Sequence, residues 1–158
     1  MSAANFDKTD QHLATIGIVL PPVPKPVANY VPYVRTGSLL FLSGQGPRKP
    51  EGGLFTGKVG GDVSADEAYK HARVVGLQLL AAMREAAGGL DNVARVVKVL
   101  GMINGVPEFG QHPRVINGCS DLFVEVLGDR GKHARSAVGM GSLPDNITVE
   151  IEAIVELK

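Results

Sequence analysis

Small and apolar residues recur every three to four positions between 65 and 87, the spacing of one buried face of an α-helix. Ser64 stands before this stretch and Glu67 three residues later, so the sequence predicts a capping box at the start of the helix. Gly88 and Gly89 predict its end. This helix is the most strongly patterned element of the chain.

Strands are predicted at 27–35, 39–43, 93–103, 134–140 and 147–157. The run LLFLS at 39–43 is apolar throughout, which predicts a strand buried on both faces. In the last segment apolar residues alternate with Glu150 and Glu152, which predicts one buried and one polar face. The last two strands are expected to run antiparallel to each other.

The order of the elements predicts the fold class. A second helix with an apolar stripe is predicted from Pro113, which suits a first helical turn, to Gly128. The pattern strand–strand–helix–strand–helix–strand–strand predicts a single α+β domain, a mixed sheet with both helices packed on one face. The other face, which carries the glutamates, is expected to be covered by a partner subunit or a ligand.

A proline-rich segment at 21–26 divides the chain. It fits neither a regular helix nor a central strand and is therefore predicted to be an extended linker. The sequence predicts an N-terminal extension at 1–26, with a short amphipathic helix at 7–18, followed by the main domain at 27–158.

Composition narrows the classes of function. The 158 residues carry 16 basic and 16 acidic side chains and no net charge, which disfavours a nucleic acid partner. No apolar run is long enough for a transmembrane helix, so no membrane partner is expected. Asp7 and Asp10 do not suit a signal peptide, which favours a cytoplasmic protein. Twenty glycines and no tryptophan predict a core of small aliphatic residues, which suggests oligomerisation.

Candidate chemistry is concentrated near the C-terminus. Arg135 opens one predicted strand and Glu150 lies on the next, so a fixed cation and a carboxylate are expected near neighbouring strand edges. Such a pair can hold a small carboxylate substrate and move a proton beside it. From the residues alone, a surface or interface ion pair of Arg135, for instance with Glu152, and a solvated Glu150 are the favoured interpretations.

Other reactive residue types give weaker signals. Cys119 lies on the apolar stripe of the second predicted helix, which favours a buried structural thiol. The glycine-rich stretch at 44–53 lacks the pattern of a phosphate-binding loop. No metal site and no cofactor are expected, because the histidines lack metal-ligand spacing. They are His12, His71, His112 and His133.

Several motifs together resemble the Rid family, the YjgF-type reactive intermediate deaminases that are also labelled L-PSP endoribonucleases. The C-terminal signature comprises Arg135-Ser136, Gly141, Leu143-Pro144 and the run Val149 to Ala153. Upstream matches are Tyr30, Ser43-Gly44-Gln45 with Pro47, and Asn117 six residues before Phe123. The resemblance covers 27–158. The chain departs from the family pattern at His133, where Pro or Ala is usual, at Ala137, where several members have Cys, and in a longer loop before Asn117.

The resemblance implies a homotrimer of chorismate-mutase-like subunits with clefts between neighbours. It also implies hydrolysis of enamines and imines, such as 2-aminoacrylate, 2-iminopropanoate and 2-iminobutanoate, to a 2-keto acid and ammonia. Arg135 would hold the substrate carboxylate and Glu150 would handle the water. The substrate would also contact Tyr30, Ser43, Gly44, Asn117 and the backbone carbonyl of Ala137. The alternatives are a non-catalytic trimeric protein that binds keto or amino acids and, less favoured, an endoribonuclease.

Overall fold

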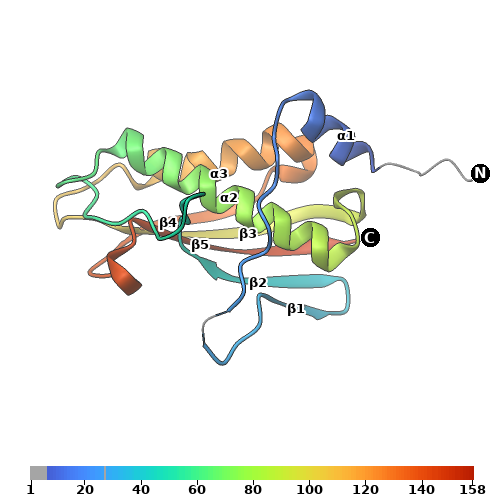
Figure 1. The fold of residues 1–158 in the computed structure, drawn as a ribbon, viewed down its shortest axis with the longest axis horizontal. Helices are drawn as coiled ribbons and strands as arrows, with labels where there is room; N and C mark the ends of the chain where they lie inside the picture. Colours follow the sequence, from blue (N-terminus) through green and yellow to red (C-terminus); the bar gives the residue numbers. More distant parts are fainter. Residues whose placement is uncertain (1–6, 27) are drawn as a thin grey trace, which may run out of the picture.

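The computed structural model describes residues 7–26 and 28–158 and contains one five-stranded sheet with helices on one face (Figure 1). The helices are α1 (Lys8–Thr15), α2 (Ala65–Ala87) and α3 (His112–Leu127). The strands are β1 (Tyr33–Thr36), β2 (Leu39–Gln45), β3 (Val93–Asn104), β4 (Ala134–Met140) and β5 (Val149–Leu157). Short 3₁₀ turns occupy Leu90–Asn92, Gly128–Gly131 and Pro144–Asn146. The predicted α+β class with a mixed sheet is confirmed.

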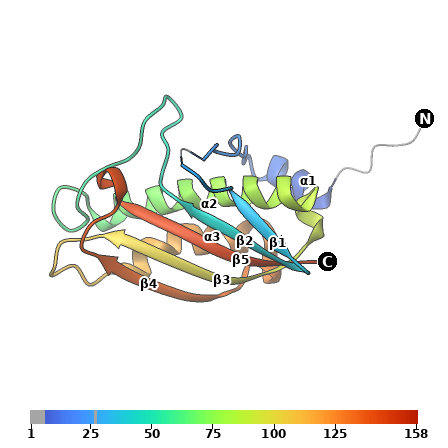
Figure 2. The same cartoon turned by 90° about the horizontal axis from the view of Figure 1, so that it is seen from below.

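The strand order is β1-β2-β5-β3-β4, which Figure 2 shows from the side of the sheet away from the helices. β5 pairs antiparallel with both β2 and β3, whereas β4 pairs parallel with β3. β4 and β5 therefore run in opposite directions, as predicted, but they are not neighbours because β3 lies between them. The expectation that Arg135 and Glu150 lie near neighbouring strand edges was wrong for this reason.

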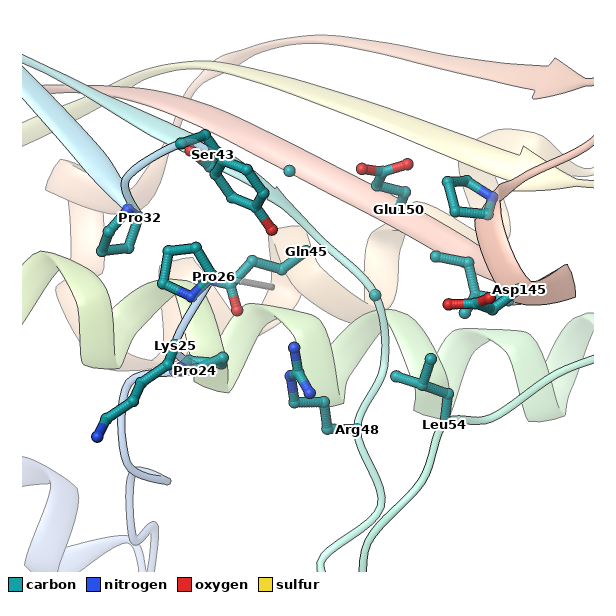
Figure 3. A pocket seen from close by; sticks show the side chains of 15 residues that line it. Pro24, Lys25, Pro26, Pro32, Ser43, Gln45, Arg48, Leu54, Asp145 and Glu150 are labelled. Atoms are coloured by element: carbon teal, nitrogen blue, oxygen red, sulfur yellow. The ribbon is translucent and has the colours of Figure 1, made fainter. Parts of the chain in front are cut away.

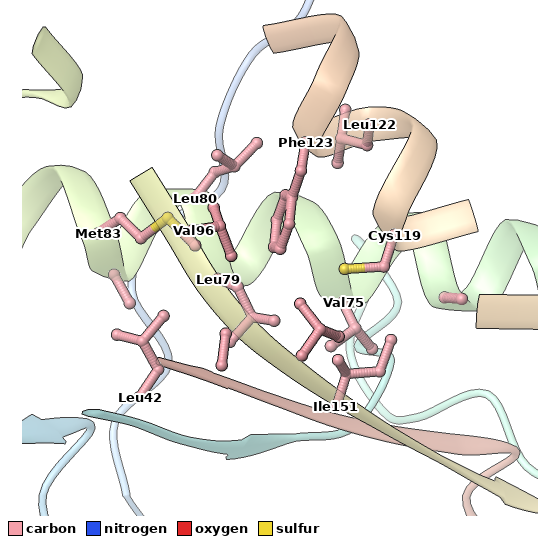
Figure 4. Close-up of a cluster of buried hydrophobic side chains, with 14 of the residues drawn as sticks. Leu42, Val75, Leu79, Leu80, Met83, Val96, Cys119, Leu122, Phe123 and Ile151 are labelled. Atoms are coloured by element: carbon pink, nitrogen blue, oxygen red, sulfur yellow. The ribbon is translucent and has the colours of Figure 1, made fainter. Parts of the chain in front are cut away.

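The core fills the space between the sheet and the helices α2 and α3 (Figure 4). Leu79 and Val75 of α2 and Phe123 of α3 are fully buried there against β3 and β5. Gly118 lets the two helices approach closely, because a Cβ at this position would collide with the backbone carbonyl oxygen of Tyr69. Cys119 is buried in the same layer, so the structural thiol is confirmed; burial raises its pKa far above the ordinary thiol value.

The predicted helix ends of α2 and α3 are confirmed. Ser64 accepts from the backbone N–H of Glu67, and the Glu67 carboxylate accepts from the Ser64 backbone, which completes the capping box. Gly88 ends α2 in the left-handed conformation, and Gly128 ends α3. Among the described residues, no helix is both long and apolar enough to cross a lipid bilayer.

Two strand predictions need correction. The first strand begins at Tyr33, and 28–32 form no strand, whereas Val27 lies outside the described residues. β2 is not buried on both faces: its burial alternates, and Phe41 is 41% exposed on the face away from the helices. The run at 39–43 is apolar throughout because the open face of β2 is also apolar, and not because helices cover both faces.

The described part of the N-terminal extension packs on the main domain. Leu13 and Leu20 are buried in the common core. The Asp91 carboxylate fastens the start of α1, since it accepts from the Thr9 hydroxyl at 2.6 Å and from the Lys8 backbone N–H at 2.8 Å. The helix is shorter than predicted because Gly17 adopts φ 72°. Residues 1–6 lie outside the described part.

Candidate functional site

Glu150 lies in a pocket of about 180 Å³ at the end of β2 (Figure 3). Four segments form its walls: the end of β2 with the loop after it, the turn before β5 with the start of β5, the proline-rich segment, and the stretch just before β1. The lining residues are Pro24, Lys25, Pro26, Tyr30, Pro32, Ser43, Gly44, Gln45, Gly46, Arg48, Leu54, Pro144, Asp145, Ile147 and Glu150. A pocket of this volume suits a small metabolite.

Glu150 reaches this pocket because successive side chains of β5 point to opposite faces of the sheet. Its neighbours Val149 and Ile151 are fully buried toward the helices, so the Glu150 side chain projects from the opposite face. Burial, and then the charge of Glu152, raise the pKa of the Glu150 carboxyl above its ordinary value. A carboxyl group with a raised pKa can take up and return a proton closer to neutral pH.

Gly44 makes room for this carboxyl. The pairing of β2 with β5 shifts between Leu42 and Gln45, so Ser43 and Gly44 form a bulge beside the glutamate. A Cβ at Gly44 would lie 2.6 Å from Oε1 of Glu150. The Glu150 carboxylate can therefore occupy this position only because residue 44 has no side chain.

Substitution of Gly44 by alanine should move the Glu150 carboxylate without unfolding the protein. The clash is with the end of a flexible side chain, and the φ of Gly44 is not left-handed, so alanine is tolerated. We expect an unchanged or higher melting temperature and, for any reaction that uses Glu150, a loss of about 10- to 100-fold in kcat/KM. Calorimetry and turnover measurements check this.

Gly118→Ala is the matched control, because its clash is with the backbone of Tyr69 and cannot be relieved by a rotamer change. It should lower the melting temperature clearly. If Gly44→Ala and Gly118→Ala lowered the melting temperature equally, Gly44 would not act only by making room for the Glu150 carboxylate.

Ser43 and Tyr30 line the pocket, as the family resemblance implies. The Ser43 hydroxyl donates to the Val31 carbonyl at 2.6 Å, and its backbone N–H donates to the Pro32 carbonyl at 3.0 Å. The hydroxyl oxygen can therefore still accept a hydrogen bond, but it does not offer a free proton. Tyr30 is 49% exposed at the pocket mouth.

The turn before β5 forms another wall and is conformationally strained. Asp145 and Asn146 both have positive φ, at 53° and 57°. The buried Asn104 side chain holds the turn, since it donates to the Asn146 side-chain oxygen at 2.9 Å and to the Gly57 carbonyl at 3.0 Å. The turn thereby places the Asp145 carboxylate in the pocket.

Arg135 lies elsewhere, on the helix side of the edge strand β4. Its Nη1 donates to Oδ1 of Asn117 at 2.8 Å and to Oγ of Ser120 at 3.0 Å, and its Nη2 donates to the Pro113 carbonyl at 3.4 Å. All three acceptors are neutral, and no ion pair joins Arg135 to a carboxylate in the described part of the chain. An ion pair between Arg135 and Glu152 is therefore absent.

A hydrogen-bond relay orients Ser120 toward Arg135. Nδ1 of His133 lies 2.6 Å from the Gly131 carbonyl, which requires a proton on Nδ1. Nε2 of this tautomer then accepts from the Ser120 hydroxyl at 2.9 Å, which leaves the hydroxyl oxygen to accept from Arg135. Burial lowers the pKa of His133, which favours this neutral form.

Arg135 and Glu150 do not meet within one chain. Arg135 lies level with Ala153 across β3, three residues from Glu150 along β5, which places their Cα atoms roughly 14 Å apart. The two side chains also project from opposite faces of the sheet. The structure thus brings together Tyr30, Ser43, Gly44 and Glu150 in one cluster, and Asn117 with Arg135 in another; Ala137, two residues after Arg135, faces the helices near the second cluster.

Sequence reasoning missed several residues of these clusters. Arg48 and Asp145 line the Glu150 pocket, and Ser120 binds Arg135. The proline-rich segment was predicted to be only a linker, yet it forms a pocket wall. Ser120 was within reach of prediction, because it stands three residues after Asn117 on the same helix face. The histidines lie apart, and no three His, Cys, Asp or Glu side chains in 7–26 and 28–158 are grouped to hold a metal ion.

Comparison with known proteins assigns the family. The family described as "YjgF/chorismate_mutase-like, putative endoribonuclease" matches residues 10–157, and the chain belongs to this family. Protein TCP17 of Trypanosoma cruzi is 41% identical over 158 residues, 99% of each chain. Atu1372 of Agrobacterium tumefaciens, a crystal structure of unknown function, is 43% identical with TM-score 0.86 over 95% of this chain and 93% of that one. The 2-iminobutanoate/2-iminopropanoate deaminase of Dermatophagoides farinae is 30% identical over 142 residues, 89% of this chain and 95% of that protein.

Proposed function

We propose that the protein is a hydrolytic deaminase of reactive enamines and imines of the 2-aminoacrylate and 2-iminopropanoate type. It releases a 2-keto acid and ammonia, and it acts as a homotrimer without a cofactor. Family membership and the name of the 30% identical relative from Dermatophagoides farinae support the reaction class. The proposal depends most on one observation, the cradle of neutral acceptors that holds the unpaired cation Arg135.

Arg135 is suited to bind a substrate carboxylate. Three of its five N–H groups are used by Asn117, Ser120 and the Pro113 carbonyl, which leaves donors for a ligand. Because those acceptors are neutral, they fix the guanidinium without cancelling its charge. The substrate carboxylate supplies the missing anion.

The complete site combines two subunits. Arg135 lies on an edge strand, and Glu150 lies on the open face of the sheet, so the Glu150 of one subunit and the Arg135 of a neighbour form one cleft. The exposed apolar side chains of the open face favour this assembly, because its interface removes them from water. They include Val34, Phe41 and Val138.

Glu150 moves the protons of the reaction. The carboxylate takes a proton from water as the water oxygen bonds to the carbon of the protonated imine, which gives a neutral carbinolamine. Glu150 then returns the proton to the amine nitrogen, the C–N bond breaks, and the hydroxyl proton leaves with ammonia as ammonium. Little rate enhancement is required, since these intermediates already hydrolyse in water, so positioning and one proton-transfer group suffice.

The test is competition with semicarbazide for imines that an amino-acid oxidase generates in situ from alanine and 2-aminobutyrate. The wild-type protein should accelerate keto-acid release, and Arg135→Ala should abolish the acceleration, because the substrate carboxylate loses its charged partner. Sedimentation should show the same trimer for both proteins. No acceleration by wild type with either imine would reject the deaminase in favour of a binding protein.

A further inference from the structure

Arg48 is the one strongly basic side chain that the loop after β2 places in the Glu150 pocket. Figure 3 shows its side chain rising into the pocket from the side opposite Glu150, whereas the Lys25 amine at the rim is turned away. No ion pair joins Arg48 to a carboxylate, and no hydrogen bond engages its guanidinium, within 7–26 and 28–158. The pocket thus holds a cation that has no partner among the described residues.

The backbone that carries Arg48 is held in place by Gln78 of α2. The Gln78 side chain is 2% exposed. Its oxygen accepts from the backbone N–H of Arg48 at 3.0 Å, and its amide donates to the Gly46 carbonyl at 2.9 Å and to the Gln45 side chain at 3.0 Å. The backbone position of Arg48 is therefore fixed, and only its exposed side chain has to be ordered when it binds a ligand.

We propose that Arg48 forms a second anion-binding subsite and that the preferred substrates are imines with a carboxylate in the side chain. This inference rests on the proposed function. The Arg135 guanidinium of the neighbouring subunit holds the carboxylate beside the imine carbon. Arg48 holds the carboxylate at the other end, and Glu150 lies between the two.

The chemistry of the pocket fits a short dicarboxylate. Its volume of about 180 Å³ is on the scale of a four- or five-carbon diacid. An unpaired guanidinium can bind a carboxylate through two parallel hydrogen bonds. The side-chain carboxylate of a small diacid can accept both of them. An alkyl side chain, as in 2-iminobutanoate, would leave Arg48 without an anionic partner.

Asp145 offers a competing explanation, because its carboxylate also lines the pocket and an Arg48–Asp145 pair would need no ligand. The two groups form no ion pair within 4.0 Å. If their charges served only to hold the pocket together, the loss of Arg48 would impair all substrates alike. The two explanations therefore differ in substrate selectivity.

The experiment compares 2-iminoglutarate, made in situ by glutamate oxidase, with 2-iminopropanoate. Arg48→Ala should lower kcat/KM for 2-iminoglutarate by about 10- to 100-fold, and that for 2-iminopropanoate by less than about threefold. Arg48→Lys should recover part of the loss. Lys49→Ala is the matched control for charge: Lys49 is the next residue, but its Nζ lies over the Phe55 ring at 5.4 Å, outside the pocket.

The outcomes separate this inference from the proposed function. Equal losses for both imines, or no loss for 2-iminoglutarate, would overturn the subsite while the deaminase stands. If wild type accelerates neither reaction, the deaminase fails, and calorimetry with 2-oxoglutarate and pyruvate decides the subsite. If wild type binds 2-oxoglutarate more tightly than pyruvate and Arg48→Ala removes this difference, the subsite is supported. Equal affinities of wild type for the two ligands would overturn it.

Discussion

Two inactive variants, Arg135→Ala and Glu150→Gln, should regain turnover when they assemble in the same trimer. In a mixed trimer one interface joins the intact Arg135 of a Glu150→Gln chain to the intact Glu150 of an Arg135→Ala chain. Because each mixed ring contains one such interface, we expect about a third of the wild-type turnover per trimer. Each variant alone should retain almost none.

This expectation follows from the arrangement of the sheet. β3 separates the strands that carry the two residues, and the side chains project from opposite faces. Coexpression of two differently tagged variants, followed by purification over both tags, isolates the mixed trimers for the imine assay.

The control is a double variant, Arg135→Ala with Glu150→Gln, coexpressed with wild type and purified in the same way. In these mixed trimers an active interface forms only between two neighbouring wild-type chains. Their turnover therefore measures the activity that intact chains contribute when the mutated chains carry neither residue. Mixed trimers of the single variants that are as inactive as their parents would mean that each chain builds its own site, and the intersubunit cleft would be rejected.

Glu150→Gln should lose activity without losing stability. Removal of a proton-transfer group costs about 100- to 10,000-fold in kcat. Burial and Glu152 raise the pKa of Glu150, so wild-type activity should fall on acidification at a higher pH than an ordinary carboxyl group would give. The pH profile of kcat/KM for wild type measures this limb, and the residual activity of the variant should lack it.

The raised pKa of Glu150 also determines how its contribution to stability changes with pH. The folded protein holds the Glu150 proton more tightly than the unfolded chain does. The contribution of Glu150 to the free energy of unfolding is therefore greatest at low pH and declines as the pH rises through the raised pKa. Glutamine carries no charge at either pH, so the variant should melt at or above the wild-type temperature at neutral pH, and this advantage should shrink near about pH 4.

Glu152→Gln is the matched control, because Glu152 lies on the same face of the same strand but is exposed. It should keep turnover and move the acid limb of the profile to lower pH, since Glu152 helps to raise the pKa of Glu150. An acid limb that Glu150→Gln leaves in place would assign proton transfer to another group.

The sequence by itself determined the elements and the composition of each face. The capping box of Ser64 and Glu67 and the stop at Gly88 depend on residues a few positions apart, and the structure contains them as predicted. The alternation in β5 put Glu150 on the face away from the helices. The C-terminal motif led to the correct family, because family motifs are read residue by residue.

Only the tertiary structure decided how the candidate residues are grouped. A strand does not carry the identity of its neighbours in its own pattern, because pairing is a competition between segments distant in sequence. Here the crossover through α3 places β4 parallel to β3, which excludes β4 from the edge of β5 and separates Arg135 from Glu150. The same long-range packing brings Arg48 into the Glu150 pocket through the buried amide of Gln78 and turns the proline-rich segment into a wall of that pocket.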